Sequence, residues 1–148
     1  MSNPFHPITI EAALTVASNL AEADRRECAE GHGLITPLDI ATPIFYSDSY
    51  YFKTPDGKSA AMGGIHADGR IWMLCTPLIK KYPLTFARDC RRMIDSRKEK
   101  LLWNIVDKRN TTHLKLLRFL GFKFLREVLH GPNYLPFIEF CKIQCAQE

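Results

Sequence analysis

The sequence predicts an α/β (α+β) fold: a mixed sheet made of an antiparallel meander plus one parallel crossover, with helices on both faces. Two observations support this prediction. Three β-rich segments separated by tight turns fill residues 50–76, as in a meander. A helical pattern then leads into a short apolar strand at residues 101–106, and strand, helix and strand in this order predict a parallel crossover.

Length and composition predict a single domain over residues 1–148, since a chain of this size buries a sizeable core. The hydrophobic fraction of 46% and the charged fraction of 24% are ordinary for a globular protein and argue against disorder. No apolar run approaches the roughly 20 residues that a membrane helix needs. The N-terminus lacks a basic stretch followed by an apolar core, so no export signal is expected.

The N-terminal third is expected to contain an edge strand and helices. The strand is placed near Ile8, after a short lead-in. Apolar residues at helical spacing predict a helix over residues 9–20, and a charged helical piece follows over 24–30. Thr36 followed by proline predicts the capped start of a short helix, which Pro43 should stop.

Turn residues divide the meander. Pro-Asp-Gly at 55–57 and Ala-Asp-Gly at 67–69 predict tight turns, because glycine accepts positive φ. The adjacent Gly63 and Gly64 are expected to weaken the middle strand or to mark a β-bulge. The three expected strands span residues 50–54, 59–66 and 70–76.

The stretch from Leu101 to Phe122 organises the rest of the chain. An apolar strand is followed by a polar turn and by a helix that Thr111 or Thr112 is expected to cap. Gly121 is placed to end this helix in the left-handed conformation. A helix from Pro83 to about residue 98 should precede the strand, and two strands, at 123–128 and 136–143, should follow the helix.

A resemblance rests on this stretch. The pattern V-x3-N-x2-[A/H]-[I/L]-x-L-x3-L-G-F runs without a gap through Val106, Asn110, His113, Leu114, Leu116, Leu120, Gly121 and Phe122. It resembles the C-terminal motif of GNAT-type N-acetyltransferases. The variant with histidine at position 113, together with the IWML strand before it and the PFIEF strand after it, is similar to the internal virion protein A family of short-tailed podovirus phages, which are GNAT-like in sequence.

The GNAT resemblance implies an acetyl-CoA site, and two features depart from it. GNAT enzymes hold the pyrophosphate of acetyl-CoA on a glycine-rich loop after the fourth strand. The corresponding residues 76–85 contain no glycine and two prolines, which leaves Lys80 and Lys81 to attract a phosphate. A tyrosine commonly acts as general acid seven residues after the asparagine, and Leu117 holds that place. Any activity would then need Tyr134, Cys75 or a water as acid.

The sequence therefore predicts a catalytically impaired GNAT-like protein with no assigned catalytic residue, no cofactor and no metal. The phage resemblance implies an internal virion or assembly protein that acts through contacts with other phage virion proteins, in the virion or the host cytoplasm. The alternative is a divergent acetyl-CoA-dependent N-acetyltransferase acting on a small amine or a host protein. Candidate residues of a vestigial acyl-CoA cleft are Lys80, Lys81, Asn110 and His113.

Two of these candidates also have a structural interpretation, which is favoured. His113 is either a base or polar group beside the cleft, or a residue at a helix N-terminus that bonds a neighbouring carbonyl. Asn110 is expected to satisfy backbone groups of its turn. Asp107 and Glu127 are candidate bases that more commonly lie solvated or paired.

The net charge of +4 does not by itself identify a nucleic-acid partner. Basic residues do cluster between Lys80 and Arg118, and solvated helix faces are the favoured explanation. The alternative is a basic face that meets DNA or an acidic surface. Five cysteines without a C-x-x-C pair are expected to be reduced thiols: Cys28, Cys75, Cys90, Cys141 and Cys145.

Overall fold

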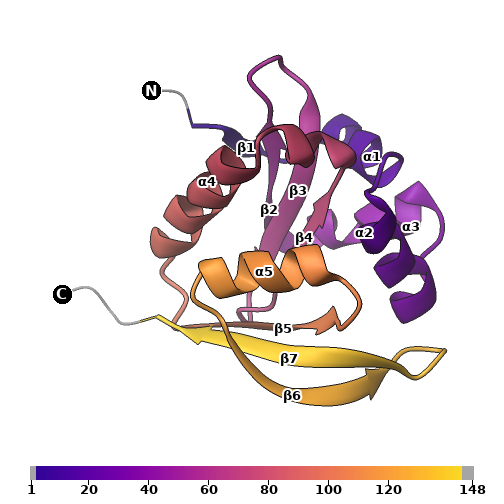
Figure 1. Cartoon of the computed structure of the whole chain (residues 1–148). Coiled ribbons are helices and arrows are strands. Elements are labelled where there is room, and N and C mark those ends of the chain that lie inside the picture. Colours follow the sequence, from indigo (N-terminus) through magenta and orange to yellow (C-terminus); the bar gives the residue numbers. More distant parts are fainter. Residues whose placement is uncertain (1–2, 145–148) are drawn as a thin grey trace.

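The computed structural model describes residues 3–144, and its elements follow the predicted order (Figure 1). Cys145 lies outside the described residues. The strands are β1 (Phe5–Pro7), β2 (Ser47–Lys53), β3 (Ser59–His66), β4 (Ile71–Cys75), β5 (Leu101–Asp107), β6 (Lys123–His130) and β7 (Leu135–Ile143). The α-helices are α1 (Ile10–Ala17), α2 (Glu22–Arg26), α3 (Pro37–Ala41), α4 (Pro83–Asp95) and α5 (Thr111–Phe119). A π-helix η1 (Glu27–Gly31) continues α2, and two 3₁₀ helices are η2 (Thr42–Phe45) and η3 (Pro77–Lys81).

The strands form two antiparallel ladders, in the orders β1-β2-β3-β4 and β5-β7-β6. A single parallel bridge between Arg70 and Trp103 joins them, at the start of β4 and β5. The predicted mixed sheet with one parallel crossover is thus confirmed, and the crossover is α4. Figure 1 shows the two halves running in different directions, with α4 and α5 on one side and α1, α2 and α3 on the other.

Each face of the sheet has its own core. On one face, α4 and α5 pack over the strands around the fully buried Leu102, together with Phe86, Cys90 and Val106. On the other face, α1 and α3 cover β3 around residues such as Val16, Ala13, Ile40 and Met62. Consecutive residues of β3 therefore serve opposite faces, with Ala61 in the first core and Met62 in the second.

The stretch from Asn110 to Phe122 has the expected helix with one correction. Asn110, and neither Thr111 nor Thr112, is the N-cap: its Oδ1 accepts the backbone N–H of His113 at 3.3 Å. At the other end Gly121 has φ +91°, and its N–H donates to the carbonyl of Arg118. The N–H of Phe122 reaches the carbonyl of Leu117, which completes a Schellman motif.

The short helix after Thr36 ends at Ala41, before Pro43, as expected; the chain then continues as the 3₁₀ helix η2, with Pro43 in its first turn, where a missing N–H is harmless. One other detail differs from the sequence-based expectation. Gly63 and Gly64 mark no bulge, and the register shift of β2 and β3 falls at Phe52 and Lys53. The glycines are needed for space, because a Cβ at Gly63 would lie 2.7 Å from the carbonyl oxygen of Trp72.

The end of η1 is held against the β6–β7 hairpin. A Cβ added to Gly31 would lie only 2.5 Å from Cζ of Phe137, so the ring of Phe137 fills the space that a side chain at this position would need. The amide of Asn133 donates to the carbonyl of Glu30, whose carboxylate also pairs with Arg109 at 2.8 Å. These contacts fix η1 and α2 relative to the second half of the sheet.

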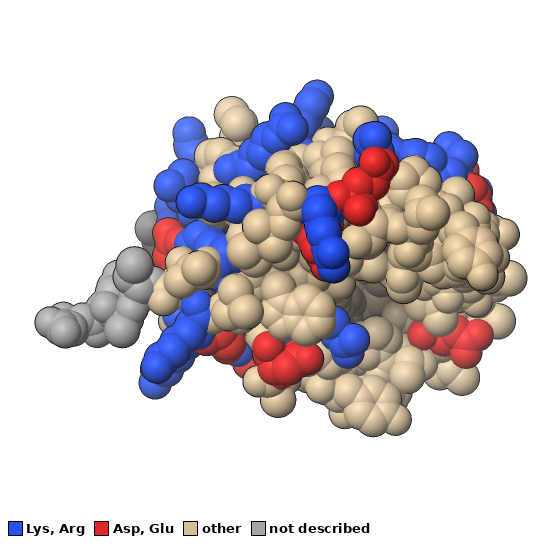
Figure 2. Space-filling model, turned by 90° about the horizontal axis from the view of Figure 1, so that it is seen from below, with Lys and Arg blue, Asp and Glu red and all other residues tan. Residues whose placement is uncertain are grey.

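A third of the basic cluster is paired within the part of the molecule that the structure describes. Arg92, Arg97, Lys108 and Arg109 each form an ion pair with a nearby carboxylate. Figure 2, which views the molecule from below, shows lysines and arginines gathered toward one side of that face. Among the described residues no helix is both long and apolar enough to cross a membrane.

Candidate functional site

A cavity of about 600 Å³ lies where β4 and β5 part. The N–H of Trp103 donates to the carbonyl of Gly69 at 3.1 Å, and the amide of Asn104 donates to the carbonyl of Ile71 at 2.7 Å. Beyond these two bonds no ladder joins the strands among residues 3–144. The strands therefore diverge from a vertex at Asn104, and the gap between them is the cavity.

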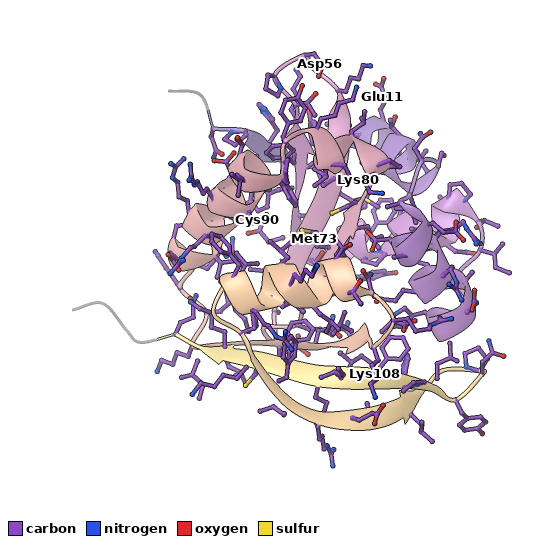
Figure 3. The ribbon with its side chains drawn as sticks, viewed as in Figure 1. Glu11, Asp56, Met73, Lys80, Cys90 and Lys108 are labelled. Carbon is purple, nitrogen blue, oxygen red and sulfur yellow. The ribbon has the colours of Figure 1, made fainter. Side chains whose placement is uncertain are left out.

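The cavity opens toward both faces of the sheet. Four consecutive residues of β4, Ile71 to Leu74, line it, and successive side chains of a strand point to opposite faces. Central strands covered by helices are usually buried, yet these four residues are only half-buried. Figure 3 places Met73 at the centre, between the sheet and α5. One wall comes from α4 and α5 and the opposite wall from η1, α3 and η2: Phe86, Cys90, Leu116, Leu117, Cys28, His32, Ile40 and Pro43.

Two carboxylates of the α2–η1 segment close the far end of the gap. The carboxylate of Asp24 accepts the backbone N–H of Cys75 at 2.7 Å and the side-chain amide of Asn110 at 2.8 Å. The carboxylate of Glu27 accepts the backbone N–H of Asp107 at 2.9 Å. Cys75 ends β4 and Asp107 ends β5, so α2 and η1 satisfy donors that the diverging strands leave unpaired.

His113 completes this polar cluster from the first turn of α5. Its Nε2 lies 3.3 Å from Oδ1 of Asp24, and both residues are buried. Burial disfavours the charged imidazole, but the carboxylate of Asp24 outweighs it and holds the pKa of His113 well above its ordinary value. Burial alone would raise the pKa of Asp24, because it disfavours the charged carboxylate. His113 and the hydrogen bonds from Asn110 and from the N–H of Cys75 outweigh this effect and lower the pKa of Asp24. Both pKa shifts favour a charged imidazole beside a charged carboxylate in this buried position.

Glu27 is the carboxylate that reaches the cavity. Glu27 is half-buried and lines the cavity, whereas Asp24 is buried and is not among the cavity-lining residues. Burial raises the pKa of Glu27, although His113 and the hydrogen bond from Asp107 act in the opposite direction. A carboxylate with a raised pKa beside a cavity is a suitable proton acceptor. Of the two candidate bases named from the sequence, Asp107 is buried and paired with Arg109, and Glu127 is exposed and paired with Lys108.

The four sequence candidates for an acyl-CoA cleft fall in three places. His113 lines the cavity. Asn110 lies behind it, as the N-cap of α5 and a partner of Asp24. Lys80 and Lys81 are exposed on η3, on the loop between β4 and α4, and are not among the cavity-lining residues (Figure 3).

The loop after β4 is a poor cradle for a pyrophosphate. Its N–H groups at Leu78, Ile79 and Tyr82 already donate to Thr76 or to Ile79. Pro77 and Pro83 have no N–H at all. The cavity has enough volume, about 600 Å³, and a sufficiently apolar lining for the pantetheine arm of acetyl-CoA. The arm therefore fits the residues present, while the diphosphate would depend on the charges of Lys80 and Lys81.

Sequence analysis missed Asp24 and Glu27. Asp24 is 51 residues from Cys75 and 86 from Asn110, so no local spacing joins them. The one available signal was the pair of acidic residues three apart, which share a helix face. The π-helix that follows is a second signal, since such turns are frequent at functional sites, but it is not visible in the sequence.

A pair of histidines next to the cavity makes stability depend on pH. Nδ1 of His32 lies 3.0 Å from Nε2 of His130, and both rings pack on Phe137. Burial of the ring, followed by the proximity of His130, lowers the pKa of His32 to about 4, and Asp107 acts weakly in the opposite direction.

We expect the protein to lose stability as the pH falls from about 6.5 to about 4. In this range His32 binds a proton in the unfolded chain but stays unprotonated in the folded protein. His32 as a residue is exposed, so solvent screening reduces the effect to about 1 kcal/mol. Urea unfolding at pH 7 and pH 4.5 checks this, with His32→Gln as comparison. Equal pH dependence in the variant and the parent chain would contradict the assignment.

Several solved structures share this arrangement of helices and strands. No protein-family model matches the chain, and no curated protein matches it. Among solved structures it is similar to a GNAT-family acetyltransferase from Bacillus anthracis (TM-score 0.70, 8% identity, 97% of this chain and 96% of that chain). It is also similar to ribosomal-protein-S5-alanine acetyltransferase from Vibrio fischeri (TM-score 0.67, 15% identity, 95% and 92%). A third is spermidine N-acetyltransferase from Vibrio cholerae in complex with CoA and spermine (TM-score 0.69, 8% identity, 95% and 94%).

At these identities the likeness establishes the fold and no more. The chain has the GNAT acetyltransferase fold over nearly its whole length, as its C-terminal motif predicts. No phage protein is among the neighbours named above, so they neither support nor oppose a relationship to phage internal virion proteins.

Proposed function

We propose that this chain is a divergent acyl-CoA-dependent N-acyltransferase. The observation that carries the proposal is the apolar cavity between β4 and β5, which opens to both faces of the sheet. Such a cavity lets a thioester arm enter from the α4–α5 face while an amine approaches from the η1–α3 face. The solved structure of spermidine N-acetyltransferase with CoA and spermine shows that the same fold accommodates both kinds of ligand.

The residues that would hold acetyl-CoA are on the α4–α5 side. Met73, Leu116 and Leu117 offer apolar contacts to the pantetheine arm. Lys80 and Lys81 attract the diphosphate by charge, in place of the usual backbone cradle. When bound, the cofactor supplies an activated acetyl thioester.

Glu27 is the proton acceptor in this proposal. Its Oε1 is fixed by the N–H of Asp107, and the side chain lies on the cavity wall. It takes one proton from the substrate ammonium group, which frees the nitrogen lone pair to attack the thioester carbonyl; the C–N bond forms, the C–S bond breaks and the CoA thiolate leaves. Leu117 occupies the place of the usual acid, and neither Tyr134 nor Cys75 is among the described residues that line the cavity. Water therefore carries the second proton of the amine nitrogen to the departing thiolate.

The first test is binding of acetyl-CoA to the purified chain by calorimetry, followed by an acetyl-transfer assay on polyamines and peptide amines. We expect Met73→Trp to weaken acetyl-CoA binding at least about tenfold, because the indole fills the cavity. Leu125→Trp, on the exposed outer side of β6, is the matched control and should bind like the parent chain. Failure of the parent chain to bind acetyl-CoA, or equal binding by Met73→Trp, would refute the proposal.

A second candidate is an internal virion or assembly protein of a podovirus, acting through contacts with other virion proteins. The sequence resemblance suggests it, and one structural observation favours it. Large apolar side chains are exposed on the β6–β7 unit: Leu125 (60% exposed), Leu129 (69%), Tyr134 (75%) and Ile143 (77%). β6 is also an edge strand, whose outer backbone groups are open to a partner.

Mass spectrometry of purified phage particles tests this second candidate. The chain should be found in the particle at constant stoichiometry, and its absence would remove the virion role. Contact with DNA or an acidic surface through exposed basic residues, such as Arg88 on α4 and Lys115 on α5, is part of this candidate. Such binding should weaken steeply with salt, and salt-insensitive binding would exclude it.

A further inference from the structure

Three side chains that can ligate a metal meet at the closed end of the gap between β4 and β5. Asp24 comes from α2, Cys75 from the end of β4, and His113 from the first turn of α5. One potential ligand atom from each lies within 4.8 Å of the others, and all three residues are buried. The three belong to separate elements, so the fold alone brings them together.

A second observation points to a ligand at this place. Nε2 of His113 is buried, and among residues 3–144 it has no hydrogen-bond partner. Oδ1 of Asp24 is 3.3 Å away but is not aligned for a hydrogen bond. In a tetrahedral zinc site, with Zn–N and Zn–O bonds of about 2.1 Å, ligand nitrogen and oxygen lie about 3.4 Å apart. The observed separation therefore suits two ligands of one ion.

The chemistry of the three donors selects the ion. A thiolate, an imidazole and a carboxylate form a set typical of zinc, whereas magnesium and calcium take oxygen ligands. The surroundings also support ligation, because metal-bound carboxylates are usually held by further hydrogen bonds. Asp24 is held in this way by the N–H of Cys75 and by the amide of Asn110.

We propose that Asp24, Cys75 and His113 form a binding site for a zinc-class divalent cation. The ion would replace the ion pair between Asp24 and His113, with the carboxylate, the thiolate and Nε2 of His113 as ligands. Three protein ligands leave one coordination position for water. The ion would fasten α2 to β4 and α5 at the end of the cavity. This proposal does not depend on acyl transfer.

Cobalt is a suitable probe, because Co²⁺ takes zinc sites and a Co²⁺–thiolate bond gives a charge-transfer band in the near ultraviolet. The reduced, metal-free full-length chain is titrated with Co²⁺. We expect one equivalent to bind, with the band and the visible spectrum of a tetrahedral ion. Cys75→Ser should abolish the band, and His113→Gln should weaken Co²⁺ binding by more than about 100-fold. Cys90→Ser, a buried thiol on α4 outside the cluster, is the matched control and should keep both.

The proposal is refuted by the absence of a saturable band at one equivalent, by its persistence in Cys75→Ser, or by its loss in Cys90→Ser. Circular dichroism shows whether each variant folds. Should Cys75→Ser fail to fold, X-ray absorption of the zinc-loaded parent chain decides instead. One sulfur with nitrogen and oxygen neighbours supports the site, and a shell with no sulfur or with several sulfurs refutes it.

Discussion

Replacement of Asp24 by alanine is expected to lower the free energy of unfolding by about 3–5 kcal/mol, because it leaves a buried partner charge uncompensated. The carboxylate accepts hydrogen bonds from the backbone of β4 and from the amide of Asn110, and it lies 3.3 Å from Nε2 of His113. Its removal leaves each of these groups without its partner in a buried environment. Urea unfolding followed by circular dichroism measures the loss.

Two comparisons make this result specific. Glu22→Ala removes a carboxylate from the same helix, but Glu22 is exposed and pairs with the exposed Arg25, so the urea midpoint should stay the same. Asp24→Asn keeps an oxygen for the N–H of Cys75 but loses the charge. Its urea midpoint should therefore lie between those of Asp24→Ala and Glu22→Ala. Unfolding is measured with a chelator present, which confines the result to the protein without metal. An Asp24→Ala variant as stable as the parent chain would mean that α2 is not anchored through this side chain.

Glu27→Gln is expected to reduce acetyl transfer by about 10²- to 10⁴-fold, the usual contribution of a general base. Glutamine keeps the shape of the side chain and an oxygen for the N–H of Asp107, but its amide cannot accept a proton at neutral pH. Binding of acetyl-CoA should be preserved, because Glu27 lies on the wall proposed for the amine. The measurement is the rate of acetyl transfer at saturating acetyl-CoA.

Glu30→Gln is the matched control for this variant. Glu30 lies on the same π-helix, but its carboxylate pairs with Arg26 and Arg109 and is not among the cavity-lining residues. Its replacement should leave the rate unchanged. A Glu27→Gln variant with the parent rate would remove Glu27 from the reaction, even if the chain still transferred acetyl groups.

The fold could be predicted largely from local patterns. The strand, turn and helix of residues 101–122 carry a period of apolar residues and a terminal glycine, and the structure follows both closely. The turns at Gly57 and Gly69 are likewise local, with positive φ at both glycines. Errors arose where a neighbour in space decided the outcome, as at Gly63, which makes room for the backbone of β4.

The candidate site was much less predictable. His113 and Asn110 were found through their motif, and the structure gives Asn110 a second role as partner of Asp24. Asp24 and Glu27 sit in a charged stretch that resembles any solvated helix, and only tertiary packing turns them inward. The half-exposure of β4 was also invisible, since its apolar sequence is that of a buried strand and the divergence from β5 depends on residues more than 25 positions away.

The vertex at Asn104 has a mechanical consequence. Near this point three hydrogen bonds cross between the two halves: the backbone N–H and the indole N–H of Trp103 donate to the carbonyls of Gly69 and Asp68, and the amide of Asn104 donates to the carbonyl of Ile71. At the far end of the gap the two strands are tied again, because Asp24 bonds the end of β4 and Glu27 bonds the end of β5. The width of the opening is therefore set at both ends, by the vertex and by the short α2–η1 segment, and not by the strand ladders themselves.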